Sequence, residues 1–248
     1  MDLVKKIIKE KTPIIILSPH FDDAILSCGE LLLQIAGKTD VTIINVFTRA
    51  HLKPYTYSAK QLLKDAGYSD AVELYKKREN EDARVLSKLP VRVVNLDLED
   101  AVFRVKEKQS FAGKLMPEFD HSYPTYRWHI LKGISKNDKA IKILKKDLEK
   151  YKNKKPLVIA PYGIGDHVDH VLVGKVCAEI FNDVLLYSDF PYNSRLNNYG
   201  NPLGNGKVYT LVPNMKEKEK LIKGYETQFV GLFPDGVIPD HKEVFFEK

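Results

Sequence analysis

Cysteine is nearly absent from this sequence, and so are long apolar runs. The two cysteines among the 248 residues, Cys28 and Cys177, lie in apolar helical patterns, which suit reduced, buried thiols better than a disulfide framework. The apolar run at residues 14–17 is far shorter than a membrane span, and no small-residue cleavage site follows it. We therefore expect no membrane insertion, no export and a cytoplasmic location.

A glycine-rich phosphate loop is also missing from the place where a nucleotide-binding α/β protein would have one. The first apolar run leads instead into PHFDD at residues 19–23. A phosphate loop cradles its ligand with backbone N–H groups at a helix N-terminus, whereas two adjacent carboxylates repel phosphate unless a metal intervenes. This segment argues against a nucleotide-binding protein.

Positive charge exceeds negative charge only modestly. The 39 Lys and Arg residues and 33 Asp and Glu residues give a net charge of +6, which favours attraction of an anionic substrate. Many lysines fall in helix-like stretches such as residues 142–155, where a solvated helix face accounts for them. We therefore expect no nucleic-acid partner. The sequence does not determine the oligomeric state, so a homo-oligomer remains one of the alternatives.

Short β-branched runs alternate with longer amphipathic stretches along the chain. This alternation predicts an α/β fold, a Rossmann-like, mostly parallel twisted sheet with helices on both faces. The length suits a single domain over residues 1–248. The expected strands are residues 14–18, 41–47, 91–97, 157–160, 184–188 and 208–212. The expected helices are residues 24–36, 71–86, 139–151, 168–181 and 215–228.

Two long segments, residues 49–68 and 104–129, have the composition of loops. In open α/β sheets, loops at the carboxyl ends of the strands build the ligand crevice. We therefore expect these two segments to border a binding site.

Polar clusters follow the first and the fourth predicted strands. The first contains His20, Asp22 and Asp23, and the second contains His167, Asp169 and His170. A catalytic zinc takes three protein ligands of the His and carboxylate type and keeps one position for water. The first cluster offers two ligands and a further carboxylate. In the second, residues 167 and 170 are one helical turn apart, so one imidazole can bind metal while the other contacts substrate.

Helix capping is the alternative explanation of these acidic residues. Asp22 and Asp23 suit the start of the following helix, and Asp166 suits the start of the helix that contains His170. Each cluster alone favours a cap. Together they favour a metal site, because three of only seven histidines fall in two strand-to-helix turns that this fold brings side by side.

With these motifs, the chain resembles the PIG-L/LmbE family of zinc-dependent N-deacetylases. Besides PHFDD and HVDH, residues 78–83 are similar to the family's Arg-x-x-Glu helix and residues 225–228 to its Tyr-x-Ser/Thr-Gln motif. LDLEDAVFR, GIGDHVDH and YSDFPY are similar to a subgroup associated with modification of sugars and glycosides. The resemblance implies an LmbE-like fold and release of acetate and a free amine from an N-acetylated sugar or glycoside of the N-acetylglucosamine type.

The same resemblance implies roles for individual residues. It makes His20, Asp23 and His170 the ligands of Zn²⁺, or of another divalent transition metal, and Asp22 the general base. It places His167 beside the scissile carbonyl, where a protonated imidazole would stabilise the oxyanion. Asp169 is either a partner that orients an imidazole or a first-turn helix acid.

Substrate contacts are the least transferable part of the resemblance. Phe21 replaces the usual proline, Ala24 stands where an acidic residue is common, and Arg49 and Ala50 replace a turn that often contains glycine. The alternatives are a hydrolase of another small amide or carbamoyl group, and a non-catalytic glycoside-binding descendant. The residues expected to line the crevice and contact substrate are Arg49, Asp100, Arg104, Tyr162, Asp189 and Tyr192.

Overall fold

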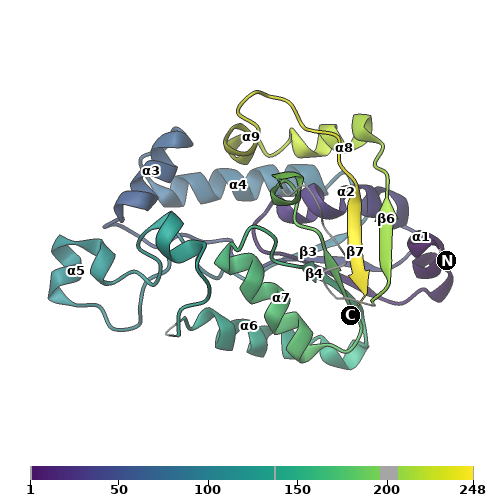
Figure 1. Ribbon diagram of the computed structural model, residues 1–248, viewed down its shortest axis with the longest axis horizontal. Coiled ribbons are helices and arrows are strands. Elements are labelled where there is room, and N and C mark those ends of the chain that lie inside the picture. Colours follow the sequence, from purple (N-terminus) through teal and green to yellow (C-terminus); the bar gives the residue numbers. More distant parts are fainter. Residues whose placement is uncertain (1, 137, 196–205, 248) are drawn as a thin grey trace.

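A computed structural model describes residues 2–136, 138–195 and 206–247. Within these ranges a seven-stranded sheet forms the centre of the protein, in the order β3-β2-β1-β4-β5-β7-β6 (Figure 1). The strands are β1 (Ile14–Ser18), β2 (Val41–Asn45), β3 (Arg92–Asn95), β4 (Leu157–Pro161), β5 (Val184–Tyr187), β6 (Val208–Leu211) and β7 (Glu243–Glu247). All strand pairs from β3 to β5 are parallel, and β7 runs antiparallel to both of its neighbours. The predicted mostly parallel α/β sheet is confirmed.

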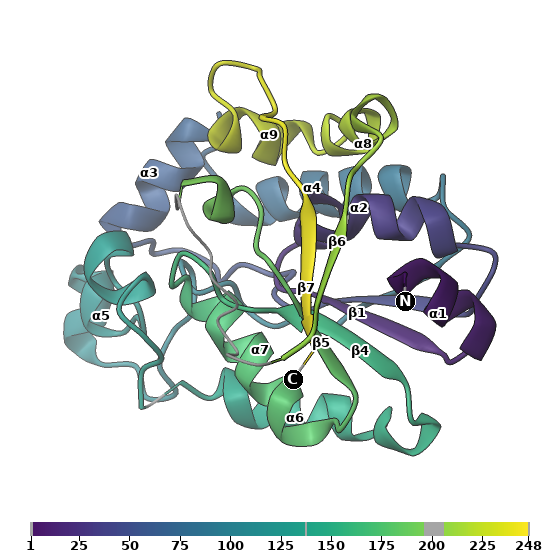
Figure 2. The same cartoon turned by 45° about the vertical axis from the view of Figure 1, so that its right-hand side comes forward.

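Helices cover both faces of the sheet (Figure 2), as predicted. One face packs against α2, α4, α8 and α9, and the other against α6 and α7. The helices are α1 (Leu3–Glu10), α2 (Asp23–Ile35), α3 (Tyr57–Asp65), α4 (Ala71–Leu86), α5 (Phe111–Leu115), α6 (Ala140–Glu149), α7 (Val168–Ile180), α8 (Met215–Ile222) and α9 (Glu226–Leu232). In the part of the chain that is described, no helix combines the length and the apolar character needed to cross a membrane.

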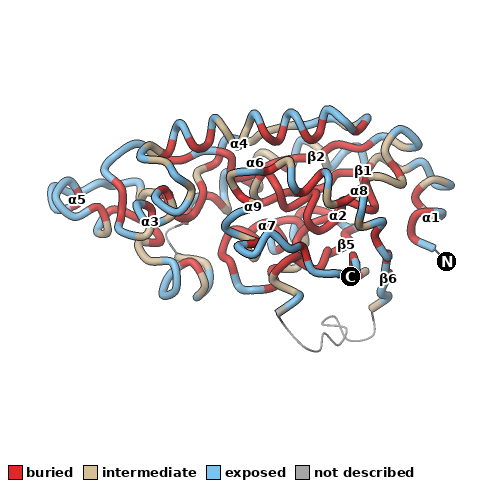
Figure 3. Tube along the Cα trace, turned by 90° about the horizontal axis from the view of Figure 1, so that it is seen from above, coloured by how far each residue is buried: buried red, intermediate tan, exposed pale blue. Residues whose placement is uncertain are grey.

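Strand β1 shows why the sequence pattern produces two hydrophobic cores. Side chains alternate across a strand, so Ile14 and Ile16 enter the core beneath α2, while Ile15 and Leu17 enter the core beneath α7. Both cysteines are free and buried, one in each core. Figure 3 shows buried backbone concentrated in the middle of the molecule and exposed backbone around α5 at one end.

The prediction of one helix over residues 215–228 is wrong, because the chain breaks between α8 and α9. Gly224 lies at the break, and a Cβ there would come within 2.4 Å of the Val85 side chain on α4. Arg84 donates a 2.9 Å hydrogen bond to the Gly224 carbonyl, so the second helix turns toward α4. Helix α1 and strand β7 were not predicted, and the expected loops 49–68 and 104–129 contain α3 and α5.

The order of the strands determines where a site forms. The chain proceeds from β1 outward through β2 to β3, and then crosses to β4 on the other side of β1. Ligands bind at such a reversal of strand order, outside the carboxyl ends of the strands. The turns after β1 and β4, which carry the two polar clusters, therefore lie beside each other.

Candidate active site

The turn after β1 holds His20 and Asp23 in fixed orientations. Ser18, the last residue of β1, donates to the His20 carbonyl at 2.5 Å and accepts from the Ala24 N–H at 2.9 Å. The Asp23 carboxylate accepts the His20 N–H at 2.8 Å. Asp22 occupies the N-cap position of α2 but its side chain makes no capping bond there. Capping therefore does not account for the Asp22 carboxylate, whereas Asp23 does lie in the first turn of α2.

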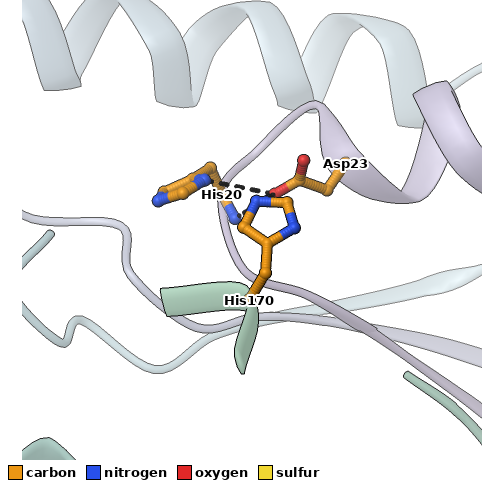
Figure 4. A group of neighbouring side chains, drawn as sticks. All are labelled: His20, Asp23 and His170. Atoms are coloured by element: carbon orange, nitrogen blue, oxygen red, sulfur yellow. Dashed lines mark hydrogen bonds and ion pairs between the residues drawn. The ribbon is translucent and has the colours of Figure 1, made fainter. Parts of the chain in front are cut away.

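His20, Asp23 and His170 point their side chains toward one another (Figure 4). One oxygen of Asp23 lies 3.2 Å from His20 Nδ1 and 3.4 Å from His170 Nε2, and ligand atoms of the three residues all fall within 4.8 Å of one another. A tetrahedral ion with bonds of about 2.0–2.1 Å has ligand-to-ligand edges of about 3.3 Å. His170 Nε2 is buried and makes no hydrogen bond with any described group. The three residues thus fit a divalent metal.

His170 is held by Asp189 from the side opposite the metal-facing nitrogen. Its Nδ1 lies 2.7 Å from one oxygen of Asp189, and the other oxygen accepts the N–H groups of Gly163 and Ile164 at 2.8 Å each. Burial lowers the pKa of His170, but Asp23 and Asp189 outweigh burial and raise it above its ordinary value. A carboxylate on the second imidazole nitrogen is the usual support of a metal-binding histidine.

A second group of residues, His20, His167 and Asp169, also lies within ligand distance. The Asp169 oxygens of this group are already engaged, because one accepts from Arg104 and the other accepts the Ala101 N–H at 2.9 Å. His20 Nε2 is 3.3 Å from that second oxygen. The first group is therefore the better metal site, and Asp169 lies where it can orient the His20 ring.

Asp22 and His167 line the cavity next to this site. Burial, followed by the charge of Asp23, raises the pKa of Asp22 to about 6. No hydrogen bond links its carboxylate to another described side chain, so the carboxylate can serve a bound molecule. His167 caps α7 by accepting the Asp169 N–H at its Nδ1, at 3.3 Å, in the place where we had considered Asp166.

The protonated form that we expected for His167 is not the one that its surroundings favour. Burial lowers the pKa of His167 to about 3, and the nearby rings of His20 and His170 act in the same direction. Because Nδ1 accepts a backbone N–H, we assign the ring proton to Nε2. His167 is therefore a neutral hydrogen-bond donor.

The cavity has a volume of about 480 Å³ and an acidic, tyrosine-rich wall. Helix α3 contributes Tyr57 and Asp65, and the segment 104–129 contributes Tyr126, so both expected loop segments border the site. Sequence reasoning missed these residues and Arg78, although Arg78 belongs to the Arg-x-x-Glu motif that we had noted. The charged lining residues are Asp22, Asp23, Asp65, Asp100 and Arg78, with His20 and His167.

Of the six residues expected to contact substrate, Asp100 and Tyr192 line the cavity. Tyr192 packs edge-on against the His170 ring with a centroid distance of 5.7 Å, and Asp100 accepts from Tyr75 at 2.6 Å.

The other four do not line this cavity, and their contact with substrate stays a prediction. Arg49 is exposed and pairs with Glu99, while the Tyr162 ring packs against Phe246. Asp189 is fully buried behind His170, and Arg104 is buried between two carboxylates. Sequence position placed them near the crevice but could not show which way their side chains turn.

Comparisons with known proteins identify the family and the fold. The sequence profile of the PIG-L family, described as GlcNAc-PI de-N-acetylase, matches residues 15–181. Over 255 residues the chain is 29% identical to a 2'-N-acetylparomamine deacetylase from Niallia circulans, with 91% of this chain and 84% of that protein covered.

Solved structures share the fold. The zinc-inhibited form of teicoplanin deacetylase Orf2 superposes with a TM-score of 0.74 at 20% identity, covering 95% of this chain and 97% of that one. The N,N'-diacetylchitobiose deacetylase from Pyrococcus horikoshii superposes with a TM-score of 0.54 at 13% identity, covering 96% of this chain and 84% of that one.

Proposed function

The chain belongs to the PIG-L family, and from this premise we propose that it is a zinc-dependent N-deacetylase that hydrolyses the acetamide of an N-acetylated sugar or glycoside. The observation that carries the proposal is the meeting of His20, Asp23 and His170 beside a buried carboxylate, Asp22, at one end of a cavity. The products are acetate and a free amine.

His20, Asp23 and His170 would hold the metal. Two imidazoles and one carboxylate suit a catalytic zinc, although iron, cobalt and manganese accept the same donors. When bound, such an ion lowers the pKa of a coordinated water and polarises the amide oxygen.

Asp22 and His167 would perform the proton chemistry. Asp22 takes a proton from the attacking water and returns it to the departing nitrogen, a role that suits a carboxyl group with a pKa near 6. His167 donates its Nε2 hydrogen to the carbonyl oxygen as negative charge develops there. Both residues are almost fully buried, at 4% exposure each, so water competes little with these contacts.

The charge of the cavity bears on the substrate. Four aspartates and one arginine line it, so the lining stays net negative even with a divalent ion bound, and an anionic substrate, which the net charge of +6 led us to expect, is disfavoured at the site itself. We propose a neutral or amine-bearing glycoside, and the relative that acts on 2'-N-acetylparomamine supports this choice. Tyr57, Tyr126 and Tyr192 offer apolar ring faces with polar tips for a sugar ring.

A screen for acetate release tests the proposal. Metal-loaded protein is incubated with N-acetylglucosamine, N,N'-diacetylchitobiose, 2'-N-acetylparomamine and an N-acetylglucosamine glycoside that carries a carboxylate. We expect release from the neutral or amine-bearing compounds and much less from the carboxylate. The Asp22→Asn variant, loaded with the same metal, is the control for contaminating activity. Absence of acetate from all compounds would refute the proposed reaction.

A further inference from the structure

Arg104 lies at the base of the long segment between β3 and α6, and its guanidinium group is buried. The residue is 5% exposed, and its guanidinium carbon lies 4.4 Å from the centre of the Phe47 ring and 5.7 Å from that of Tyr123. Buried arginines are rare unless they are paired, so the role of this side chain lies in its polar contacts.

The guanidinium joins three separate parts of the chain. Its Nη1 donates to Asp138 at 2.6 Å, its Nη2 donates to Asp169, and its Nε donates to the Glu99 carbonyl at 2.9 Å. Both carboxylate side chains are 0% exposed. Asp138 also accepts from the Tyr123 hydroxyl at 2.7 Å. The Arg104–Asp138 pair thus links the two ends of the segment that places Tyr126 at the cavity.

The contact with Asp169 leads to the candidate metal site. With one oxygen bound by Arg104, Asp169 directs the other toward the Ala101 N–H, at 2.9 Å, and His20 Nε2, at 3.3 Å. A hydrogen on Nε2 leaves the lone pair on Nδ1, the nitrogen that faces Asp23 at 3.2 Å. Carboxylates that fix a histidine tautomer in this way commonly contribute to metal affinity.

We propose that Arg104 is a positioning residue for His20, acting through Asp169. Through its bond with Asp138, it also connects the segment that carries Tyr126 with the candidate metal site. This inference rests on the metal site of the proposed function. Arg104 does not line the cavity. Its planar group bonds two carboxylates at once, which a lysine ammonium does less well because it is a single point charge.

Metal affinity is the readout that separates this role from a merely structural one. Dissociation constants for Zn²⁺, from competition with a chelator, are compared between the wild type and Arg104→Gln. We expect the variant to bind the metal about 10–100-fold more weakly, the usual effect of removing such outer partners. Arg104→Lys should recover part of this loss. At saturating metal, kcat of Arg104→Gln should remain below the wild-type value.

Asp138→Asn is the matched control, because it removes the charge that pairs with Arg104 at the end of this segment and leaves the contact between Arg104 and Asp169 in place. We expect its metal affinity to equal that of the wild type while KM rises through the altered position of Tyr126. Asp169→Asn should weaken metal binding as much as Arg104→Gln, and the double variant should be no weaker than either, because coupled residues are not additive.

Two results would overturn the inference: wild-type metal affinity in Arg104→Gln, or an equal loss of affinity in Asp138→Asn. If Arg104→Gln does not fold, Arg104→Lys takes its place, and unchanged affinity in that variant overturns the inference as well. Failure of the proposed function gives a different result, because the wild type itself would then bind no metal or release no acetate.

Discussion

Two adjacent aspartates acquire opposite properties from their contacts. Burial by itself raises the pKa of Asp23, but His170 and His20 outweigh it and bring the pKa down to about 2. For Asp22, burial and the charge of Asp23 outweigh the opposing charges of His20 and Arg78, and its pKa rises to about 6. Neighbouring carboxyl groups whose pKa values are pushed apart in this way are suited to different roles. Asp23 is the candidate ligand and Asp22 the candidate base.

Replacing Asp22 with asparagine tests this division. The variant keeps the size of the side chain but cannot accept a proton. We expect kcat for acetate release to fall by about 10²–10⁴-fold, the usual contribution of a general base, with metal content unchanged. Metal analysis and steady-state kinetics on the same preparation check both parts. Loss of the metal together with activity would show that Asp22 is a ligand.

Asp189 supports His170 much as Asp169 supports His20. In Asp189→Asn the charge that faces His170 Nδ1, at 2.7 Å, is removed while the side-chain volume is kept. We expect metal affinity to fall by about 10–100-fold, measured by chelator competition. Asp166→Asn is the control, because Asp166 is exposed and lies in the same turn as Gly163 and Gly165. Equal dissociation constants for wild type and Asp189→Asn would contradict a supporting role.

At the scale of secondary-structure elements, the main finding is that a side chain of β7 accepts hydrogen bonds from backbone N–H groups of α2. Helix α2 is kinked at Cys28, which has φ −132° and ψ 15°. The N–H groups of Glu30 and Leu31 donate instead to the Glu243 carboxylate of β7, at 2.7 and 3.0 Å. A break in a helix must satisfy the backbone groups that it frees, and here a distant strand does so.

Lys218 of α8 balances the buried charge of Glu243. Its Nζ donates to Glu243 at 2.6 Å and to His241 Nε2 at 2.7 Å, and both members of the ion pair have side chains that are 0% exposed. The His241 ring stacks on Phe190, with centroids 3.7 Å apart. Phe190 leads directly into Pro191 and Tyr192, which line the cavity. This cluster therefore supports one wall of the site.

His241 gives the cluster a dependence on pH. Burial, aided by the charge of Lys218, lowers the pKa of His241 to about 4 from an ordinary value of 6.5. Between these two values the unfolded chain binds a proton at this position and the folded chain does not. The contribution of neutral His241 to the free energy of unfolding is therefore fully present above about pH 6.5 and is lost as the pH falls toward 4.

We expect the free energy of unfolding of His241→Gln to decline less steeply than that of the wild type between these pH values. Urea unfolding of both proteins across the range isolates the residue, because the other titrating groups are common to both. Parallel profiles would contradict the assignment of a neutral His241 in the folded protein.

Elements that depend on local pattern were predicted well. Strand β1 and helix α4 begin and end where the sequence places them, since a continuous β-branched run and a capped, periodic stretch specify them locally. Asp70 caps α4 by accepting the Val72 N–H at 2.9 Å. The break between α8 and α9 and the pairing of β7 depend on contacts with α4, β5 and β6, so local pattern could not indicate them.

For the whole molecule, the candidate metal would connect two halves of the fold. His20 and Asp23 come from the turn between β1 and α2, whereas His170 comes from α7, which follows β4. An ion that binds the folded chain alone stabilises it, by about 2.7 kcal/mol at a free concentration ~100 times Kd. In a protein of this size that corresponds to about 5–10 °C in Tm.

We therefore expect removal of metal with a chelator to lower Tm by an amount of this order, and added Zn²⁺ to restore it. The Asp23→Ala, His170→Ala double variant should show no response to either treatment. Thermal unfolding followed by circular dichroism measures the effect. A double variant that responds like the wild type would mean that the metal binds elsewhere on the protein.

The amino-acid order was sufficient for the fold class and for the position of the two polar clusters. Both depend on periodicity and on the rule that parallel strands end at one edge. The set of candidate ligands came from the family resemblance of the motifs in these clusters. Tertiary structure alone gave the two aspartates different pKa values, paired Arg104 with two buried carboxylates and gave His167 a neutral ring. Contacts such as the one between His20 and Asp169, 149 residues apart in sequence, set those properties through burial and charge, which no local pattern records.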